Sequence, residues 1–251
     1  MPHRMPVSQA TTSLVNTGNM SRQVASQLMQ TDRSVNVAEL RRGFEDPVMS
    51  CFLIDASPSM APYADAVIQG QNVMLSSLRG SAKCRKNALY VAQWLFSGDI
   101  KILNPFSPLQ KAGPDSVAVL DATNYRPENG DGTALYATVL HVLQDMAANI
   151  AYAFGQNIRT TFTVGLITDG DDTRGGAQPS DIKSIVQELK AKGHLSRSTV
   201  IGIQNPHLPR QKIAAIKDSI GFDEDISVGQ SASEIRRAFA LATQSAVRGQ
   251  I

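Results

Sequence analysis

From Val48 onward, short apolar runs alternate with segments of helical periodicity, and no other feature of the sequence restricts the fold as strongly. Runs such as 49–54 (MSCFLI) and 162–167 (FTVGLI) are short and nearly continuous, which is typical of strands covered on both faces. In the segment from Leu135 to Phe154, apolar residues instead recur every three or four positions, as in an amphipathic helix. The alternation predicts an α/β fold with a mostly parallel central sheet and helices on both faces.

The same patterns divide the rest of this region into strands and helices. The runs 87–96 and 100–103 are joined by a Ser-Gly-Asp turn, which predicts a hairpin and one antiparallel edge strand. Ser231 and Glu234 stand three residues apart and predict a capping box for the last helix. Further strands are predicted at 199–203 and 226–228, and further helices at 64–78, 209–220 and 235–246. Another helix is predicted to begin after an N-cap at Ser180 and to stop at Gly193.

The first 47 residues differ in composition from the rest. Residues 1–43 contain no Phe, Tyr or Trp and are rich in Ser, Thr, Asn and Gln, so they can contribute little to a packed core. A short helix is predicted from Ser21, as its N-cap, to Gln30. We interpret residues 1–47 as a polar, flexible tail in front of a domain spanning 48–251. The alternative is a segment that becomes ordered against the domain or a partner.

Charge and apolar content exclude several classes of protein. Twenty-four basic and 22 acidic side chains leave a formal net charge of +2, which gives no long-range attraction to nucleic acid or an anionic membrane. No apolar run approaches the roughly 18–20 residues of a spanning helix, and the N-terminus lacks the apolar core of a secretory signal. Two cysteines cannot build a disulfide framework or a four-ligand zinc site. We therefore expect a cytoplasmic globular protein without nucleic-acid or membrane partners.

Acidic residues and hydroxyls gather where predicted strands end. In an open parallel sheet, ligands bind beyond the carboxyl ends of the strands, so the loops after Ile54, after 117–120 and after Ile167 are the candidate site. The first strand runs into DASPS (55–59), and the later one runs into TDGDD (168–172). The glycine-rich loop ENGDGT, which ends at Thr133, leads into the long helix between them.

Asp55, Ser57, Ser59, Thr133 and Asp169 form an oxygen-rich set that suits a divalent cation. Mg²⁺ prefers oxygen ligands in near-octahedral geometry and keeps several waters. Alternate residues of an extended chain turn the same way, so Asp55, Ser57 and Ser59 can converge just past the strand. The three hydroxyls would bind directly, whereas the two aspartates would hold coordinated waters or the metal itself. With few anionic ligands, the ion would stay electrophilic and accept one more carboxylate from outside.

These motifs, in this order and at these element ends, resemble the von Willebrand factor type A (vWA) domain over roughly residues 48–247. Asp55-x-Ser57-x-Ser59, the glycine-flanked Thr133 and Thr168-Asp169-Gly170 match the five positions of its metal-ion-dependent adhesion site (MIDAS). The resemblance implies a Rossmann-like sheet flanked by helices and a bound Mg²⁺ or Mn²⁺. It also implies that an acidic residue of a protein partner completes the coordination of the metal. Known domains of this family are mostly binding modules, so we expect no enzymatic activity.

Within that family, the chain is similar to intracellular bacterial proteins associated with tellurite resistance and stress. Ile226-Ser227-Val228, followed by a Ser-capped helix that contains Phe239, is similar to the closing pattern of those proteins. The absence of a signal peptide and of paired cysteines argues against a secreted adhesion role. The resemblance implies as partner an AAA+ ATPase of the MoxR type, or a kinase and phosphatase of a stress-response set. The residues do not choose among them.

Three other interpretations of the same residues remain open. Asp55, Ser57 and Ser59 would also suit a helix N-cap and turn, although caps explain neither Thr133 nor Asp169. A Mg²⁺-dependent phosphohydrolase would use acidic strand ends in a similar way, but the motif offers no paired base or evident general acid. A scaffold that binds through its N-terminal segment or its helical faces would need the metal only for structure.

Overall fold

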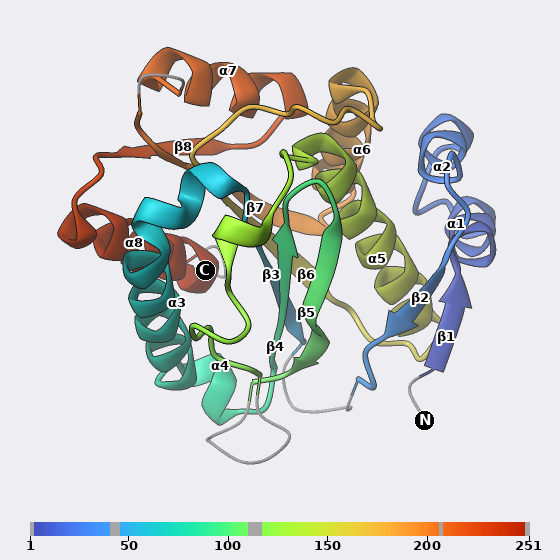
Figure 1. Cartoon of the computed structure of the whole chain (residues 1–251). Coiled ribbons are helices and arrows are strands. Elements are labelled where there is room, and N and C mark those ends of the chain that lie inside the picture. The colour runs from blue at the N-terminus through green and yellow to red at the C-terminus, as the bar shows by residue number, and fades with distance from the viewer. Residues whose placement is uncertain (1–2, 41–45, 110–116, 206–207, 249–251) are drawn as a thin grey trace.

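The computed structural model describes residues 3–40, 46–109, 117–205 and 208–248, and its centre is a six-stranded sheet (Figure 1). Neighbouring strands are parallel except at one edge, where β4 and β5 form the predicted antiparallel hairpin. The predicted fold class is therefore confirmed. In spatial order the strands are β5 (Ile100–Pro108), β4 (Leu89–Phe96), β3 (Val48–Asp55), β6 (Thr161–Thr168), β7 (Leu195–Ile203) and β8 (Glu224–Val228).

Helices cover both faces of the sheet (Figure 1). One face carries α5 (Leu135–Gly155), α6 (Pro179–Ala191) and α7 (Arg210–Ile220), and the other carries α3 (Ala64–Arg79) and α8 (Ala232–Arg248). Alternation along β3 explains the two layers, because Cys51 and Leu53 pack on the first face and Phe52 and Ile54 on the second. Each face thus has its own hydrophobic core, as expected for a doubly covered sheet.

Several local expectations need correction. The helix predicted to be capped by Ser180 begins at Pro179, with Gln178 as an N-cap that makes no side-chain hydrogen bond. Residues 117–120 form no strand end but pack on the face of the sheet that α3 covers, where the Ala118 carbonyl accepts a 2.8 Å hydrogen bond from Gln93 of β4. Short elements that the sequence patterns did not predict are α4 (Ala82–Arg85) and the 3₁₀ helices η1 (Pro58–Tyr63) and η2 (Pro127–Asn129).

The flexible-tail interpretation of the first 47 residues is also corrected. Residues 3–40, which we call the N-terminal module, form a two-stranded antiparallel sheet and two helices beside α5 and α6 (Figure 1). Their apolar side chains belong to the same hydrophobic core as β3 and α5, so the module is an ordered layer of the domain. Its elements are β1 (His3–Pro6), α1 (Val7–Asn16), α2 (Arg22–Leu28), which has the predicted Ser21 N-cap, and β2 (Ser34–Val37).

Buried polar side chains on α5 are matched to the module. Gln144 donates to the carbonyls of Leu28 and Thr31 at 2.7 and 2.9 Å, and Asn149 accepts a 2.8 Å hydrogen bond from the Ala38 amide. Asp145, 4% exposed, accepts a hydrogen bond from the Arg33 guanidinium. Buried polar groups are costly without partners. The polar residues on the outer face of α5 therefore need the module as their partner.

Asp145 makes the stability of the fold depend on pH. Burial raises the pKa of its carboxyl to about 7, although Arg33 opposes the shift. The folded chain thus keeps a proton that the unfolded chain releases above about pH 4. We expect the wild type to lose unfolding free energy relative to Asp145→Asn as pH rises from 5 to 7, by up to about 1.4 kcal/mol per pH unit. His141, which is half-buried beside Arg33 and has a lowered pKa, is present in both proteins, so its titration does not contribute to their difference.

Urea denaturation of the two proteins at pH 5, 6, 7 and 8, in EDTA, measures this difference. A difference in unfolding free energy that stays constant across the series would contradict the buried, protonated state of Asp145. The two proteins can also differ in unfolding free energy by an amount that is the same at every pH. Only the change of this difference with pH reports on the titration of Asp145.

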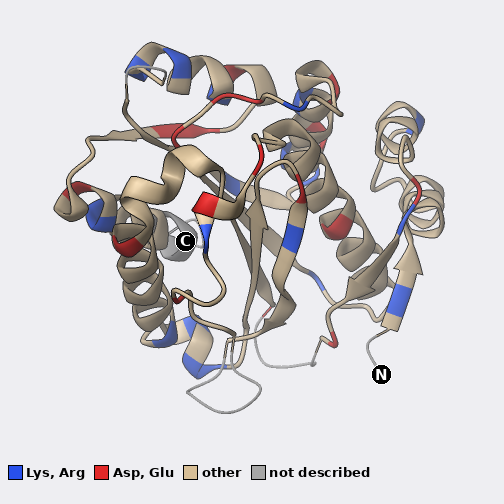
Figure 2. Ribbon diagram, viewed as in Figure 1, with Lys and Arg blue, Asp and Glu red and all other residues tan. Residues whose placement is uncertain are grey.

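Charged residues are unevenly distributed over the fold. Figure 2 shows acidic positions in the loops above the carboxyl ends of the strands and basic positions around α4 at the opposite end. Among the helices that the structure describes, none combines the length and apolar character needed to span a bilayer. The acidic end of the sheet is thus where a cation would be attracted.

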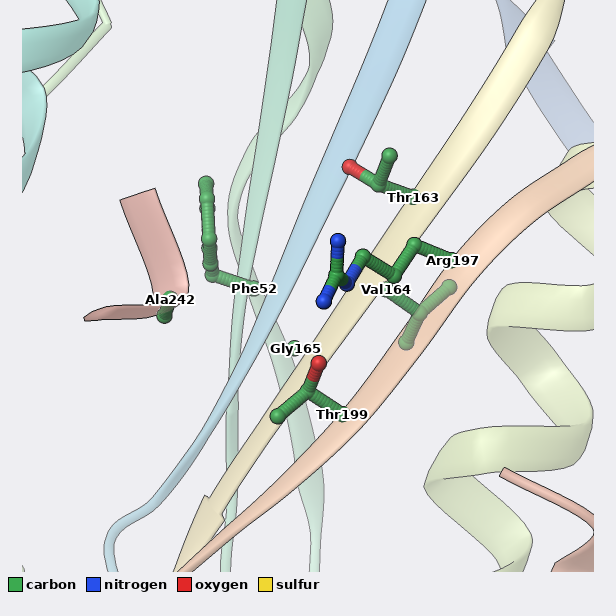
Figure 3. A pocket seen from close by; sticks show the side chains of 7 residues that line it. All are labelled: Phe52, Thr163, Val164, Gly165, Arg197, Thr199 and Ala242. Atoms are coloured by element: carbon green, nitrogen blue, oxygen red, sulfur yellow. The ribbon is translucent and has the colours of Figure 1, made fainter. Parts of the chain in front are cut away.

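A small cavity lies between the sheet and α8, lined by side chains from β3, β6, β7 and α8 (Figure 3). Phe52 and Ala242 supply apolar walls, and Thr163, Thr199 and Arg197 supply polar groups. Its volume of about 10 Å³ is roughly that needed for a single water. This cavity is too small to be a ligand site.

Candidate metal site

The two acidic strand ends are neighbours in the sheet. Asp55 is the last residue of β3 and Thr168 the last of β6, and the parallel register pairs Ile54 with Ile167 just before them. The Thr168 hydroxyl donates a 2.5 Å hydrogen bond to Asp55 Oδ2. Strand pairing alone therefore brings the loop after Asp55 and the loop that starts at Asp169 to the same place.

Hydroxyls of the first loop lie between the two carboxylates. The Ser57 amide donates to Asp55 Oδ1 at 2.8 Å, which folds the chain back so that both serines turn inward. Ser57 Oγ and Ser59 Oγ are 3.1 Å apart, and Ser59 Oγ donates to Asp169 Oδ1 at 2.7 Å. The convergence of Asp55, Ser57 and Ser59 that alternation predicts is confirmed, and Asp169 joins them through Ser59.

Thr133 reaches the same place from the loop before α5. Its backbone is fixed by a 2.8 Å hydrogen bond from the Thr133 amide to Thr173 Oγ1 and a 2.9 Å bond from the Thr173 amide back to the Thr133 carbonyl. Gly132 has φ +93°, and a Cβ there would lie 3.0 Å from Thr173 Oγ1, so this position favours glycine. Its hydroxyl lies next to Gly170: a Cβ added to that glycine would be 3.9 Å from Thr133 Oγ1.

Hydrogen bonds thus link four of the predicted residues, and Thr133 lies beside Gly170, the residue after Asp169. We call the five residues the oxygen cluster: Asp55, Ser57, Ser59, Thr133 and Asp169. All but Ser59 are buried, and Ser59 is exposed at the surface. Burial, together with the nearby charge of Asp169, raises the pKa of Asp55 to about 6, against the hydrogen bonds from Ser57 and Thr168. Two buried carboxylates this close favour a positive charge between them.

The donor set fits a small divalent cation. Oxygens bound to an octahedral Mg²⁺ at about 2.0–2.1 Å are about 2.9 Å from their neighbours in the coordination shell. The Ser57–Ser59 and Ser59–Asp169 oxygen separations, 3.1 and 2.7 Å, are hydrogen-bond distances that also lie near that value. The fit therefore rests on the donor chemistry, because carboxylate and hydroxyl oxygens are the ligands that Mg²⁺ prefers.

Three residues outside the predicted set support the cluster. Thr168 orients the Asp55 carboxylate, and the Tyr125 hydroxyl donates a 2.7 Å hydrogen bond to the Asp55 carbonyl. The Asn205 amide donates to the Asp169 carbonyl at 2.6 Å and to its Oδ2 at 3.2 Å. Asn205 follows β7, so the rule of polar residues at strand ends could have found it; no sequence pattern marks Tyr125.

The remaining acids of the second loop have structural roles. Asp171 forms an ion pair with Lys212 of α7 at 2.7 Å. Asp172 accepts hydrogen bonds from the amides of Tyr136, in the first turn of α5, and Gly175 at 3.2 and 2.6 Å. These contacts fix the loop against α5 and α7.

No protein-family model matches the sequence, and no curated protein sequence matches it. Solved structures, in contrast, match the fold of this chain. Proximal thread matrix protein 1 from the mussel byssus, in a structure with a zinc-occupied MIDAS motif, has a TM-score of 0.55 at 16% identity, over 81% of this chain and 48% of that one. The PilB minor pilin of Streptococcus sanguinis has a TM-score of 0.55 at 15% identity, over 82% and 62%. The von Willebrand factor type A protein of Catenulispora acidiphila has a TM-score of 0.50 at 13% identity, over 80% and 43%.

These similarities show that the chain has the vWA fold. The chain spans about half the length of the byssus protein and less than two thirds of the other two. Sequence identities below 20% do not extend to function. What this chain does must therefore be argued from its own oxygen cluster.

Proposed function

We propose that this protein is a non-enzymatic binding module that engages an acidic residue of a protein partner through Mg²⁺ or Mn²⁺. The ligands are Asp55, Ser57, Ser59, Thr133 and Asp169. One observation carries the proposal: two buried carboxylates and three hydroxyls lie together at the carboxyl edge of a vWA sheet, and these oxygens are the kind of ligand that Mg²⁺ prefers.

The chemistry of the cluster favours binding of an external carboxylate. The two aspartates supply at most two negative charges, and hydrogen bonds to Asp55 and Asp169 hold both in place. A bound divalent ion would therefore carry no excess negative charge from its ligands, and the neutral hydroxyls on its surface side would leave it able to accept one more carboxylate. The exposed Ser59 marks the open side, from which a partner would approach.

A phosphohydrolase would need further groups around the cluster. Tyr125 is beside it, but burial and the charges of Asp55 and Asp169 raise the pKa of its hydroxyl well above the usual value, which makes it a poor base. Among the described residues, no histidine hydrogen-bonds to the cluster; His141 and His194 are near basic side chains elsewhere. These observations favour binding over catalysis.

The cellular setting belongs to the same proposal. The sequence resemblance to intracellular bacterial proteins of tellurite resistance and stress supports a cytoplasmic multiprotein assembly. An AAA+ ATPase of the MoxR type, or a kinase and phosphatase pair, would then be the partner. Any of these can present an exposed Asp or Glu side chain to the metal.

A pull-down from lysate of the source organism tests the function. The tagged protein is incubated in parallel with Mg²⁺ and with EDTA, and retained proteins are identified by mass spectrometry. We expect a specific partner that is retained only with Mg²⁺, and retention at least about tenfold weaker for Thr133→Ala, because one metal-binding hydroxyl is removed.

Thr12→Ala is the matched control, since Thr12 is exposed on α1 and far from the cluster. A partner retained equally in EDTA would refute metal-dependent binding and point to the module or a helix face. Magnesium-dependent turnover of p-nitrophenyl phosphate that is lost in Thr133→Ala would instead establish the phosphohydrolase.

A further inference from the structure

A surface hollow opens directly beside the oxygen cluster, and we call it the side hollow. It has a volume of about 330 Å³ and lies above the end of β4, between the β4–β5 turn and the segment 123–130. Ala56, which stands between the ligands Asp55 and Ser57, lines it. Pockets of this size hold small ligands or side chains. The side hollow is thus continuous with the face on which a partner would meet the metal.

Both walls of the side hollow are fixed to the segments that carry the metal ligands. On one side, the Tyr125 hydroxyl bonds to the Asp55 carbonyl. On the other, the Ser97 carbonyl accepts a 2.6 Å hydrogen bond from the Ala134 amide, next to Thr133. Gly130 packs so closely that a Cβ there would lie 2.5 Å from the Ala56 carbonyl. The position of the hollow relative to the cluster is therefore rigid.

The side hollow carries two basic side chains. Lys101 of β5 and Arg126 line it, and neither forms an ion pair with any residue that the structure describes. Arg126 Nε donates to the Ala122 carbonyl at 3.0 Å, which orients the guanidinium. Asp99 is the one acidic residue of the lining; nearby, Asp131 lies at Gly98 and is paired with Arg174, and Glu128 is exposed next to Asn129. Within the lining itself, two basic side chains face one acid, and a bound divalent cation would add to their attraction for an anion.

We propose that the side hollow is a second binding subsite, in which Lys101 and Arg126 hold a second carboxylate of the same protein partner whose first carboxylate is bound through the cation. This inference rests on the proposed function. On this inference, the partner is recognised by two acidic side chains at a fixed separation. A single carboxylate bound to the metal would not distinguish one acidic partner from another. Lys101 and Arg126 then determine specificity, while the oxygen cluster supplies the anchor.

Selection from a random 12-residue peptide library displayed on phage tests the inference. The immobilised wild-type protein is screened in Mg²⁺, with elution by EDTA, and enriched peptides are sequenced. We expect peptides that share one invariant acidic residue and a second at constant spacing. Synthetic peptides with either acid replaced by its amide then give the contribution of each by fluorescence anisotropy.

Variants that change the charge of the side hollow test whether the second acidic residue of the peptide binds there. In Lys101→Gln and Arg126→Gln, the affinity for the two-acid peptide should fall by about three- to tenfold each. The peptide that lacks the second acid should be unaffected by either change. Asp99→Asn should strengthen binding of the two-acid peptide. Arg22→Gln, on the exposed surface of the N-terminal module, is the matched control and should leave binding unchanged.

The outcomes separate this inference from the function on which it rests. EDTA-eluted peptides with one acid only, or with a second acid whose contribution does not change in the Lys101 and Arg126 variants, would overturn the subsite and leave the metal-dependent module standing. Competition by inorganic phosphate without selection of a second acid would show that the hollow takes a free anion instead. Absence of any magnesium-dependent enrichment would overturn both.

Discussion

Replacing Asp55 by alanine is expected to abolish binding of divalent cations, with an affinity loss of at least about 100-fold. The substitution removes one of two carboxylates from the cluster, and changes even to supporting residues of metal sites cost 10- to 100-fold. Isothermal titration calorimetry with Mn²⁺ and Mg²⁺ measures the loss. Capture of the partner should fall in parallel, because its acidic residue would have no ion to bind.

Two further variants make this result interpretable. Asp55 accepts hydrogen bonds from Ser57 and Thr168, so its loss leaves buried donors unpaired, and circular dichroism must confirm the fold. Ser57→Ala removes a proposed ligand with less structural cost and should also abolish binding. Asp171→Ala removes an exposed carboxylate two residues from Asp169 and should bind the ion normally. Normal cation binding by both Asp55→Ala and Ser57→Ala would show that the ligand assignment is wrong.

Replacing Leu28 by alanine is expected to lower the free energy of global unfolding by about 2–5 kcal/mol. Leu28 ends α2 and is 0% exposed in the core shared by the N-terminal module and α5. Truncation of a buried leucine removes its apolar surface and leaves a cavity. Because native proteins are stable by only about 5–15 kcal/mol, this would be a large fraction of the total.

The neighbouring Met29 provides the control. Its side chain is 39% exposed, so Met29→Ala should change stability by no more than about 0.5 kcal/mol. Urea denaturation followed by circular dichroism gives both values. If Leu28→Ala were as stable as Met29→Ala, residues 3–40 would be detached from the domain in solution and the tail interpretation would be restored.

The long, periodic elements were predictable because their patterns are local. The apolar run of β3, the heptad-like spacing of α5 and the capping box at Ser231 each depend on neighbours within a few residues. Glu234 indeed receives a 2.6 Å hydrogen bond from the Ser231 hydroxyl. The prediction of Ser180 as the N-cap was wrong because Pro179 already suits the first helical position, so the helix begins two residues earlier than predicted.

The N-terminal module was not predictable from composition. Its lack of aromatic residues suggested that it could not form a core of its own. The structure shows that it needs none, because Val7, Leu14 and Leu28 share the core of α5. The polar residues Gln144, Asp145 and Asn149 look like an exposed helix face in sequence, yet they bind the module. Because these contacts join residues more than a hundred positions apart, they produce no pattern in the sequence around either residue.

By itself, the sequence determined the fold class and the five residues of the oxygen cluster. Strand ends and the candidate ligand motifs each occupy a short segment of sequence, and pairing in a parallel sheet then brings the ends of neighbouring strands together. Only the tertiary structure decided what surrounds the cluster. Tyr125 beneath Asp55, Asn205 beside Asp169, and Lys101 and Arg126 in one hollow come from separate elements. Their proximity follows from packing among distant parts of the chain, which no spacing along the sequence encodes.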